Sequence, residues 1–156
     1  MNAIKERKIV YTSDQIAERV RAMAAEIDAF YGDEPLVAVC VLKGAVFFFT
    51  DLVRAMRTEN LELDFVRLSS YGKGTSSSRH VVFSKDVVDS GLSMQFLMRQ
   101  FEARGARSLR LAALVDKNER REVDVRVDFA GFKLEEGFIV GYGLDYAEKY
   151  RALPDV

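Results

Sequence analysis

A short run of small and polar residues, Asp89-Ser90-Gly91-Leu92-Ser93, follows an apolar stretch that ends at Val88. A phosphate group is bound by several backbone N–H groups that converge on it, and Gly91 has no side chain to block that approach. Ser90 and Ser93 add hydroxyl groups, and a helix beginning after them would add a favourable dipole. The run therefore predicts a phosphate-binding loop, although the same residues taken alone could form a simple helix cap.

The composition and charge indicate a globular chain of one domain. Of its 156 residues, 49% are hydrophobic and 30% are charged, which suffices for one sizeable core. The formal net charge of -1 gives no electrostatic argument for a nucleic-acid or anionic membrane partner. The only cysteine, Cys40, lies in an apolar run and is expected to be a buried hydrophobic residue in a reducing compartment.

Targeting and membrane segments are not expected. The strongest apolar stretch, at 36–49, is broken by Lys43 and is shorter than a membrane span. Residues 1–7 lack the apolar core of a secretory signal. We therefore expect a cytoplasmic protein.

Apolar residues at two kinds of spacing predict strands that alternate with helices. A three- and four-residue spacing predicts a helix over 13–30, and a valine-rich run predicts a buried strand over 36–42. Further helices are expected at 44–57 and 90–104, further strands at 61–68, 109–115, 123–129 and 138–142, and a mobile polar loop at 69–78. This order is typical of an α/β fold with a mostly parallel sheet, in which ligands bind beyond the carboxyl ends of the strands.

Several segments, taken in order, resemble one known family. Residues 87–93 resemble the phosphoribosyl-pyrophosphate (PRPP) loop of the type I phosphoribosyltransferases. From about Ile9 to the end, the chain resembles the hypoxanthine (hypoxanthine-guanine) phosphoribosyltransferases of purine salvage. The pyrophosphate loop of this family is matched by Val41-Leu42-Lys43-Gly44, and the start of its mobile flap by Leu68-Ser69-Ser70-Tyr71-Gly72. Its purine-reading lysine segment is matched by Leu114-Val115-Asp116-Lys117-Asn118-Glu119-Arg120-Arg121. Its base-stacking segment is matched by Phe138-Ile139-Val140-Gly141-Tyr142-Gly143-Leu144-Asp145-Tyr146, and its C-terminal signature by Tyr150-Arg151-Ala152-Leu153-Pro154.

On the phosphate side, the resemblance implies that Asp89-Ser90-Gly91-Leu92-Ser93 holds the 5′-phosphate of PRPP, largely through backbone N–H groups. Lys43 and Gly44 would face pyrophosphate across an unusual, often cis, peptide bond. Arg151 would contact pyrophosphate directly, and Asp145 would hold Mg²⁺ with its pyrophosphate. These roles suit the displacement of pyrophosphate from C1 of a ribose, because negative charge develops on the leaving group.

On the base side, the resemblance places Asp89 near the purine N7 as general base or proton relay. Lys117 would donate to the purine 6-oxo group, Phe138 would stack on the base, and the Ile139 backbone would read the edge of the base. The other charged residues of 118–121 are expected to form a solvated turn.

The resemblance also implies a fold and an activity. The fold would be a mostly parallel, twisted central sheet flanked by helices, in a single domain over residues 1–156, with a small hood built from the terminal segments. The activity would be the Mg²⁺-dependent conversion of PRPP and hypoxanthine, or guanine, to IMP or GMP and pyrophosphate. Ser70 and Tyr71 would belong to a flap that closes over the site and excludes water. The family commonly forms dimers or tetramers, so we expect a homo-oligomer.

One region departs from the family pattern. Between flap and PRPP loop the family has a long excursion and then a core strand that ends in two acidic residues, which hold the ribose hydroxyls. Tyr71 and Asp89 are too close for all of that. In one interpretation residues 79–84 are the core strand and Lys85-Asp86 replaces the acidic pair. In the other, residues 79–87 are the return arm of the flap, and the strand and both acids are absent.

Residue matching favours the second interpretation, and fold physics favours the first. A PRPP loop must follow a buried strand, and deletion of a central strand would break two ladders. We expect residues 81–84 to form that strand unless a segment is missing between Ser78 and Asp89, which is our hypothesis for this spacing. Lys85 would then weaken ribose binding, and Asp86 would be a ribose or metal contact.

Two alternative functions follow. The shortened flap region and Lys85 favour a PRPP- or nucleotide-sensing module that keeps the fold without efficient catalysis. A transferase that prefers xanthine is the other alternative, because Lys117 would read only the 6-oxo group and leave the 2-substituent open.

Overall fold

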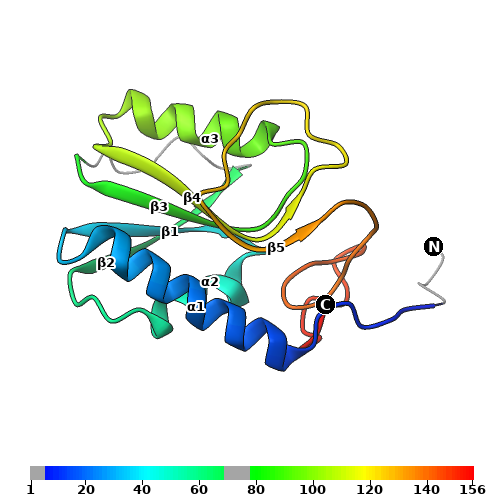
Figure 1. The fold of residues 1–156 in the computed structure, drawn as a ribbon. Helices are drawn as coiled ribbons and strands as arrows, with labels where there is room; N and C mark the ends of the chain where they lie inside the picture. The colour runs from blue at the N-terminus through cyan, green and yellow to red at the C-terminus, as the bar shows by residue number, and fades with distance from the viewer. Residues whose placement is uncertain (1–5, 69–77) are drawn as a thin grey trace.

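A five-stranded parallel sheet forms the centre of the computed structural model, which describes residues 6–68 and 78–156. The strand order is β2-β1-β3-β4-β5, and each neighbouring pair is parallel. One face is covered by two helices and the other by a third (Figure 1). The strands are β1 (Leu36–Leu42), β2 (Leu61–Arg67), β3 (His80–Val88), β4 (Ser108–Lys117) and β5 (Phe129–Leu134), and the helices are α1 (Ser13–Tyr31), α2 (Val46–Ala55) and α3 (Leu92–Ala103). The expected α/β class is confirmed.

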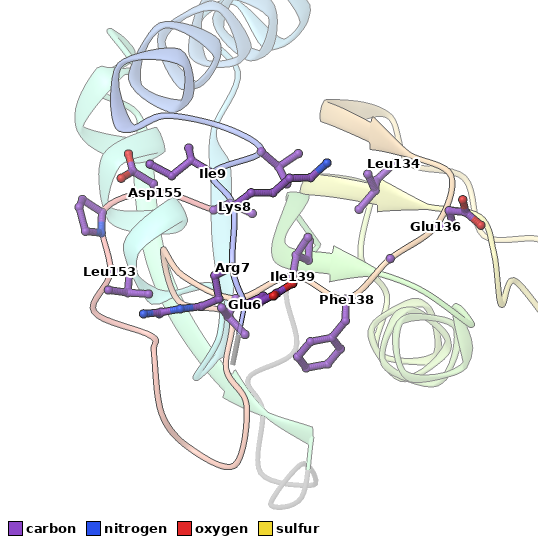
Figure 2. A pocket seen from close by; sticks show the side chains of 15 residues that line it. Glu6, Arg7, Lys8, Ile9, Leu134, Glu136, Phe138, Ile139, Leu153 and Asp155 are labelled. Atoms are coloured by element: carbon purple, nitrogen blue, oxygen red, sulfur yellow. The ribbon is translucent and has the colours of Figure 1, made fainter. Parts of the chain in front are cut away.

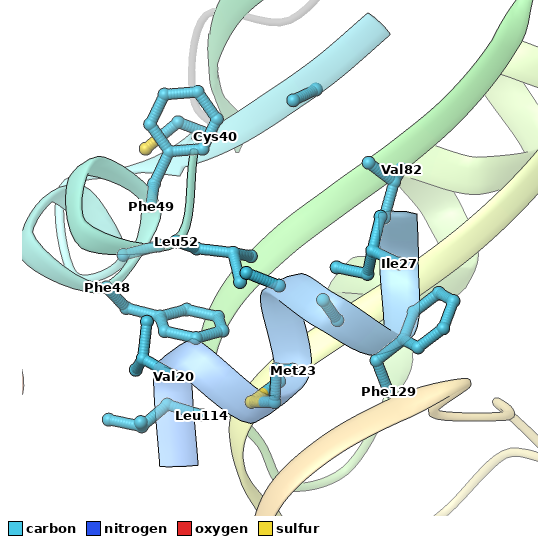
Figure 3. Packing of buried hydrophobic residues seen from close by; sticks show 14 of the residues in the cluster. Val20, Met23, Ile27, Cys40, Phe48, Phe49, Leu52, Val82, Leu114 and Phe129 are labelled. Carbon is cyan, nitrogen blue, oxygen red and sulfur yellow. The ribbon is translucent and has the colours of Figure 1, made fainter. Parts of the chain in front are cut away.

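Two apolar cores hold these layers together. On one face, side chains of α1 and α2 interdigitate over β1, with Met23, Ile27 and Phe48 almost fully buried (Figure 3). On the other, α3 packs Met94 and Leu97 against the opposite side of the same strands. Since these strands are covered on both faces, they carry unbroken apolar runs: all of β1, Val81-Val82-Phe83 of β3 and Leu111-Ala112-Ala113-Leu114-Val115 of β4.

Cys40 is a buried apolar residue of the first core, as its surroundings in the sequence predict. Burial, together with the negative charge of Asp86, raises the pKa of its thiol to about 12. At neutral pH the thiol is therefore protonated and poorly nucleophilic.

The position of β3 decides between the two interpretations of residues 79–88. β3 lies in the middle of the sheet, paired with β1 on one side and with β4 on the other. Val81, Val82 and Phe83 are buried on it. Residues 81–84 thus form the core strand, as the first interpretation expects, while the absence of a segment between Ser78 and Asp89 stays a hypothesis. The parallel ladders need a buried strand at this position, and His80–Val88 supplies it directly before the glycine-containing loop.

Two predicted strands are wrong. Residues 123–128 are irregular, and the strand begins only at Phe129, because Val123, Val125 and Val127 pack under α3 as single side chains without a neighbouring ladder. These valines alternate with charged residues in the sequence, which is the pattern expected of a strand. Residues 138–142 are also irregular: Gly141 has a φ of 103° and makes only an isolated bridge to Leu144.

The helices predicted at 44–57 and 90–104 are shorter than expected. α2 begins at Val46 and α3 at Leu92, because the preceding residues form the loops that leave β1 and β3. Nowhere in residues 6–68 and 78–156 is a helix long and apolar enough to cross a membrane.

The two ends of the described chain lie together. Val10 and Tyr11 donate backbone hydrogen bonds to the Val156 carbonyl, and the Tyr11 ring stacks on Phe132 with ring centroids 4.0 Å apart. The N-terminal segment therefore lies beside the C-terminal one (Figure 1). A single domain with a hood built from these segments stays a prediction.

Candidate functional site

The loops that leave β1, β3 and β4 meet at one edge of the sheet, because these three strands are adjacent and parallel. β1 is followed by a cis peptide bond between Leu42 and Lys43. β3 is followed by the run that begins at Asp89, and β4 ends at Lys117. The sequence-predicted residues of the first three motifs thus lie on neighbouring loops.

The loop after β3 leads directly into α3. Gly91 is the N-cap of α3, with a φ of 86° that favours glycine, and it has no side chain to cap the first-turn N–H groups. A Cβ at this position would also press on Val123 and Arg121. The only side-chain bond within the loop runs from the Leu92 N–H to Ser90 Oγ, at 3.3 Å. A simple side-chain cap is therefore not what forms here, and the helix N-terminus presents N–H groups and a positive dipole to an anion.

Arg121 fixes this loop from behind, a role that the prediction of a solvated turn missed. Its guanidinium donates to the carbonyls of Asp89 (2.8 Å), Val88 (3.3 Å) and Val125 (3.1 Å), and it pairs with Asp116 Oδ1 at 2.5 Å. One planar fork of donors thus joins the loop after β3 to the end of β4. The sequence offers little signal for it, because the preceding residue, Arg120, is also an arginine and is exposed.

We expect Arg121→Met to lower the free energy of unfolding by about 3 kcal/mol, because partly buried carbonyls and Asp116 lose a charged donor. Affinity for ribose 5-phosphate should fall with it, since the loop loses its support. Arg120→Met is the matched control, being one residue away and exposed. Urea unfolding and titration calorimetry measure both effects. Equal unfolding midpoints for the two variants would contradict the anchoring role.

Lys43, Gly44, Asp145 and Arg151 come together from two segments about 100 residues apart in the chain. Arg151 Nη1 donates to the Gly143 carbonyl at 2.6 Å, and Nη2 lies 3.4 Å from Asp145 Oδ1. Gly143, with a φ of 99°, packs so tightly that a Cβ there would overlap the Gly44 carbonyl oxygen. The structure therefore brings all four predicted residues to one place.

Asp86 supports this place from the end of β3. Only 7% of Asp86 is exposed, and Lys85 Nζ lies 2.8 Å from its Oδ1. Its Oδ2 occupies the space that a Cβ on Gly44 would take. A buried carboxylate needs a partner, and Lys85 supplies one. Lys85 and Asp86, which stand where the family has two acidic residues, thus form an ion pair next to Gly44.

Lys117 and Asp89 form the predicted base-reading end of the site. Lys117 is 8% exposed, with its Nζ 3.3 Å from Glu119 Oε2 and 3.9 Å from Asp89 Oδ2. Asp89 Oδ1 is buried and has no hydrogen-bond partner among the described residues. An unsatisfied buried carboxylate oxygen beside a lysine can accept a proton or a donor from a ligand.

Phe138 and Ile139 line a different part of the structure. Phe138 is 67% exposed and meets Tyr146 edge-on, with ring centroids 5.7 Å apart. Both residues line a cavity of about 920 Å³ between the N-terminal segment and residues 134–140, where Lys8 also points (Figure 2). Neither Asp89 nor Lys117 lines this cavity, so a shared base-binding pocket for these four residues stays a prediction. Ser70 and Tyr71 lie outside the described residues.

Within the described part of the chain, no three carboxylate, histidine or cysteine side chains gather as a metal site. Mg²⁺ is commonly held by one or two carboxylates together with substrate phosphates. Asp145, whose side chain is 33% exposed with Oδ1 3.4 Å from Arg151 Nη2, is the carboxylate that fits this requirement.

The chain matches known proteins over most of its length. The model of the phosphoribosyl transferase domain matches residues 6–147. The hypoxanthine-guanine phosphoribosyltransferase of Bacillus subtilis is 38% identical, covering 94% of this chain and 89% of the relative. The hypoxanthine-guanine-xanthine phosphoribosyltransferase of Tritrichomonas foetus is 39% identical, covering 94% and 88%. The Bacillus subtilis alignment has 162 positions against 156 residues here, so that relative carries internal residues that this chain lacks.

Solved structures agree with these relatives. A hypoxanthine-guanine phosphoribosyltransferase from Bacillus anthracis superimposes with a TM-score of 0.90 at 36% identity, covering 97% of each chain. The enzyme from Leishmania tarentolae, solved in complex with GMP, gives a TM-score of 0.88 at 34% identity, covering 95% of this chain and 93% of that one. With sheet, loops and sequence in agreement, the chain belongs to the hypoxanthine-guanine phosphoribosyltransferase family of type I phosphoribosyltransferases.

Proposed function

We propose that this protein transfers the phosphoribosyl group of PRPP to hypoxanthine or guanine, with IMP or GMP and pyrophosphate as products. One observation carries the proposal: adjacent parallel strands bring a phosphate-type loop, a pair of cations and a buried lysine to one edge of the sheet. The names of the relatives support the choice of bases, and the GMP complex of the Leishmania tarentolae protein supports the choice of product.

Each group has one task in this reaction. A purine ring nitrogen attacks C1 of the ribose, the bond from C1 to the pyrophosphate oxygen breaks, and the purine loses a proton. Asp89 takes that proton, a role supported by its unsatisfied Oδ1. Lys43 and Arg151 stabilise the charge that develops on pyrophosphate. Lys117 donates to the 6-oxo group with the ammonium that, without substrate, lies 3.3 Å from Glu119 Oε2.

Two further tasks concern the phosphates. The backbone of residues 89–93 holds the 5′-phosphate at the N-terminus of α3. Asp145 is the residue that would hold Mg²⁺, which when bound neutralises charge on pyrophosphate. Asp86, the other candidate metal or ribose contact, faces Lys85 and Gly44 with its two oxygens. We therefore assign Asp86 a positioning role.

A nucleotide-synthesis assay tests this function. The protein is incubated with PRPP, Mg²⁺ and hypoxanthine, guanine or xanthine in turn, and the nucleoside monophosphate is quantified. We expect IMP and GMP. Product with xanthine alone would favour the xanthine-preferring alternative; the Tritrichomonas foetus relative is named for all three bases.

A sensing module is the second candidate, and Lys85 is the observation that favours it. An ammonium at the end of β3 cannot accept hydrogen bonds from ribose hydroxyls as a carboxylate can. Binding of PRPP without product from any base would support this candidate and reject the enzyme. Formation of a nucleoside monophosphate from any of the bases would reject the sensing module.

We further propose a cytoplasmic homo-oligomer, a dimer or tetramer. The free, buried Cys40 suits a compartment in which thiols stay reduced. Leu63 and Phe65 on the outer strand β2 are 46% and 51% exposed, which suits a face covered by another subunit. Light scattering coupled to size-exclusion chromatography measures the assembly.

A further inference from the structure

The proposed function assigns pyrophosphate binding to Lys43 and Arg151. The carboxylate of Glu148 lies between these two cations. Glu148 Oε2 is 2.6 Å from Lys43 Nζ, and Glu148 Oε1 is 3.4 Å from Arg151 Nη2. Each oxygen of the carboxylate thus contacts one cation. This spacing of two anionic oxygens also suits the oxygens of a phosphoryl group, which lysine and arginine bind with the same donors.

The backbone holds Glu148 in this position. Ala147 and Glu148 have φ values of 52° and 66°, in the region that L-residues rarely adopt. The Glu148 N–H donates to Asp145 Oδ2 at 2.9 Å, so the turn is tied to the candidate metal ligand. A strained turn that persists at a site is commonly part of how that site works.

Stability does not account for the bridge that Glu148 makes. Its side chain is 64% exposed, and that of Lys43 is 49% exposed. Exposed ion pairs contribute little to folding because water and salt screen them. A glutamate carboxylate carries its negative charge at neutral pH. Exposure also leaves the side chain room to swing away.

We propose that Glu148 is an internal competitor of pyrophosphate. Its carboxylate occupies the anion position between Lys43 and Arg151 when the site is empty, leaves when pyrophosphate binds, and returns as pyrophosphate departs. The inference rests on the proposed function, which assigns these cations to pyrophosphate. In the empty site the Glu148 carboxylate keeps Lys43 and Arg151 in place. During product release it lowers the affinity for pyrophosphate.

The test is titration calorimetry with sodium pyrophosphate, without added metal, on the full chain. We expect Glu148→Gln and Glu148→Ala to bind pyrophosphate about tenfold more tightly than the parent, because neither replacement carries a competing charge. Affinity for ribose 5-phosphate should stay the same, since residues 89–93 hold that group. The matched control is Glu26→Gln, which breaks another exposed pair, with Arg19 Nη1 at 3.1 Å, on α1. It should change neither affinity.

Unchanged or weaker pyrophosphate binding in both Glu148 variants would overturn the inference. A third variant, Lys43→Met, separates this failure from failure of the proposed function. If Lys43→Met weakens pyrophosphate binding while the Glu148 variants do not strengthen it, the pyrophosphate site stands and only the competitor role is lost. If Lys43→Met leaves the affinity unchanged, the assignment of pyrophosphate to this site is itself wrong.

Discussion

Replacement of Asp89 by asparagine should lower kcat by about 100- to 10,000-fold, the usual contribution of a positioned general base. The amide has the shape of the carboxylate but cannot take a proton from the purine ring. Asp89 Oδ1 is buried and without a hydrogen-bond partner among the described residues, so the loss of charge breaks no bond at that oxygen. Steady-state kinetics with hypoxanthine measures the effect. The KM for PRPP should change little, because the loop keeps its backbone geometry.

Asp33→Asn is a suitable control for this experiment. It makes the same chemical change in an exposed turn between α1 and β1 and should leave kcat unaltered. An Asp89→Asn protein with full kcat would remove the proton-transfer role. A raised KM with unchanged kcat would instead indicate that Asp89 only helps to bind substrate.

Gly143→Ala should be the most damaging change on the pyrophosphate side. The added Cβ would overlap the Gly44 carbonyl oxygen, which belongs to the backbone and cannot rotate away, and a φ of 99° is unfavourable for alanine. The two loops must then separate, and Arg151 loses the Gly143 carbonyl that it contacts. We expect pyrophosphate affinity to fall at least 100-fold and the free energy of unfolding to fall by about 3 kcal/mol. Calorimetry and urea unfolding measure the two.

Gly105→Ala separates the backbone effect from the overlap. Gly105 has a similar φ of 89°, but no atom lies within 4 Å of the position of an added Cβ. Its replacement should lower stability by about 1–2 kcal/mol and leave pyrophosphate binding intact. Equal losses of pyrophosphate affinity in the two variants would show that the contact between Gly143 and Gly44 does not matter for the ligand.

The sheet and three of its loops could be predicted because their signals are continuous in the sequence. The apolar run of β1 and the glycine-containing run after β3 each lie within about ten residues. Burial on both faces explains why β3 forms at 80–88 although residue matching favoured a flap arm. Local patterns are informative when neighbouring residues share one environment.

The remainder depends on contacts between distant residues. Nothing near Arg121 in the sequence indicates that its acceptors are the carbonyls of Val88 and Asp89 on another loop. The valines of 123–127 alternate like a strand, yet they pack as single side chains beneath α3. The replacement of an acid by Lys85 was evident from the sequence, but its ion pair with Asp86 behind Gly44 needed the structure.

The close approach of Gly143 to Gly44 has a consequence for the cooperativity of the molecule. The segment around Gly143 has no regular helix or strand, yet its N–H groups are paired. Those of Gly141, Tyr142 and Gly143 donate to the carbonyls of Leu144, Leu153 and Arg151 in that order. Since the same segment presses on the loop that leaves a central strand, it cannot open without disturbing that loop. The amide hydrogens of this segment should therefore exchange with solvent as slowly as those at the carboxyl end of β1. This irregular segment would then unfold in the same cooperative unit as β1.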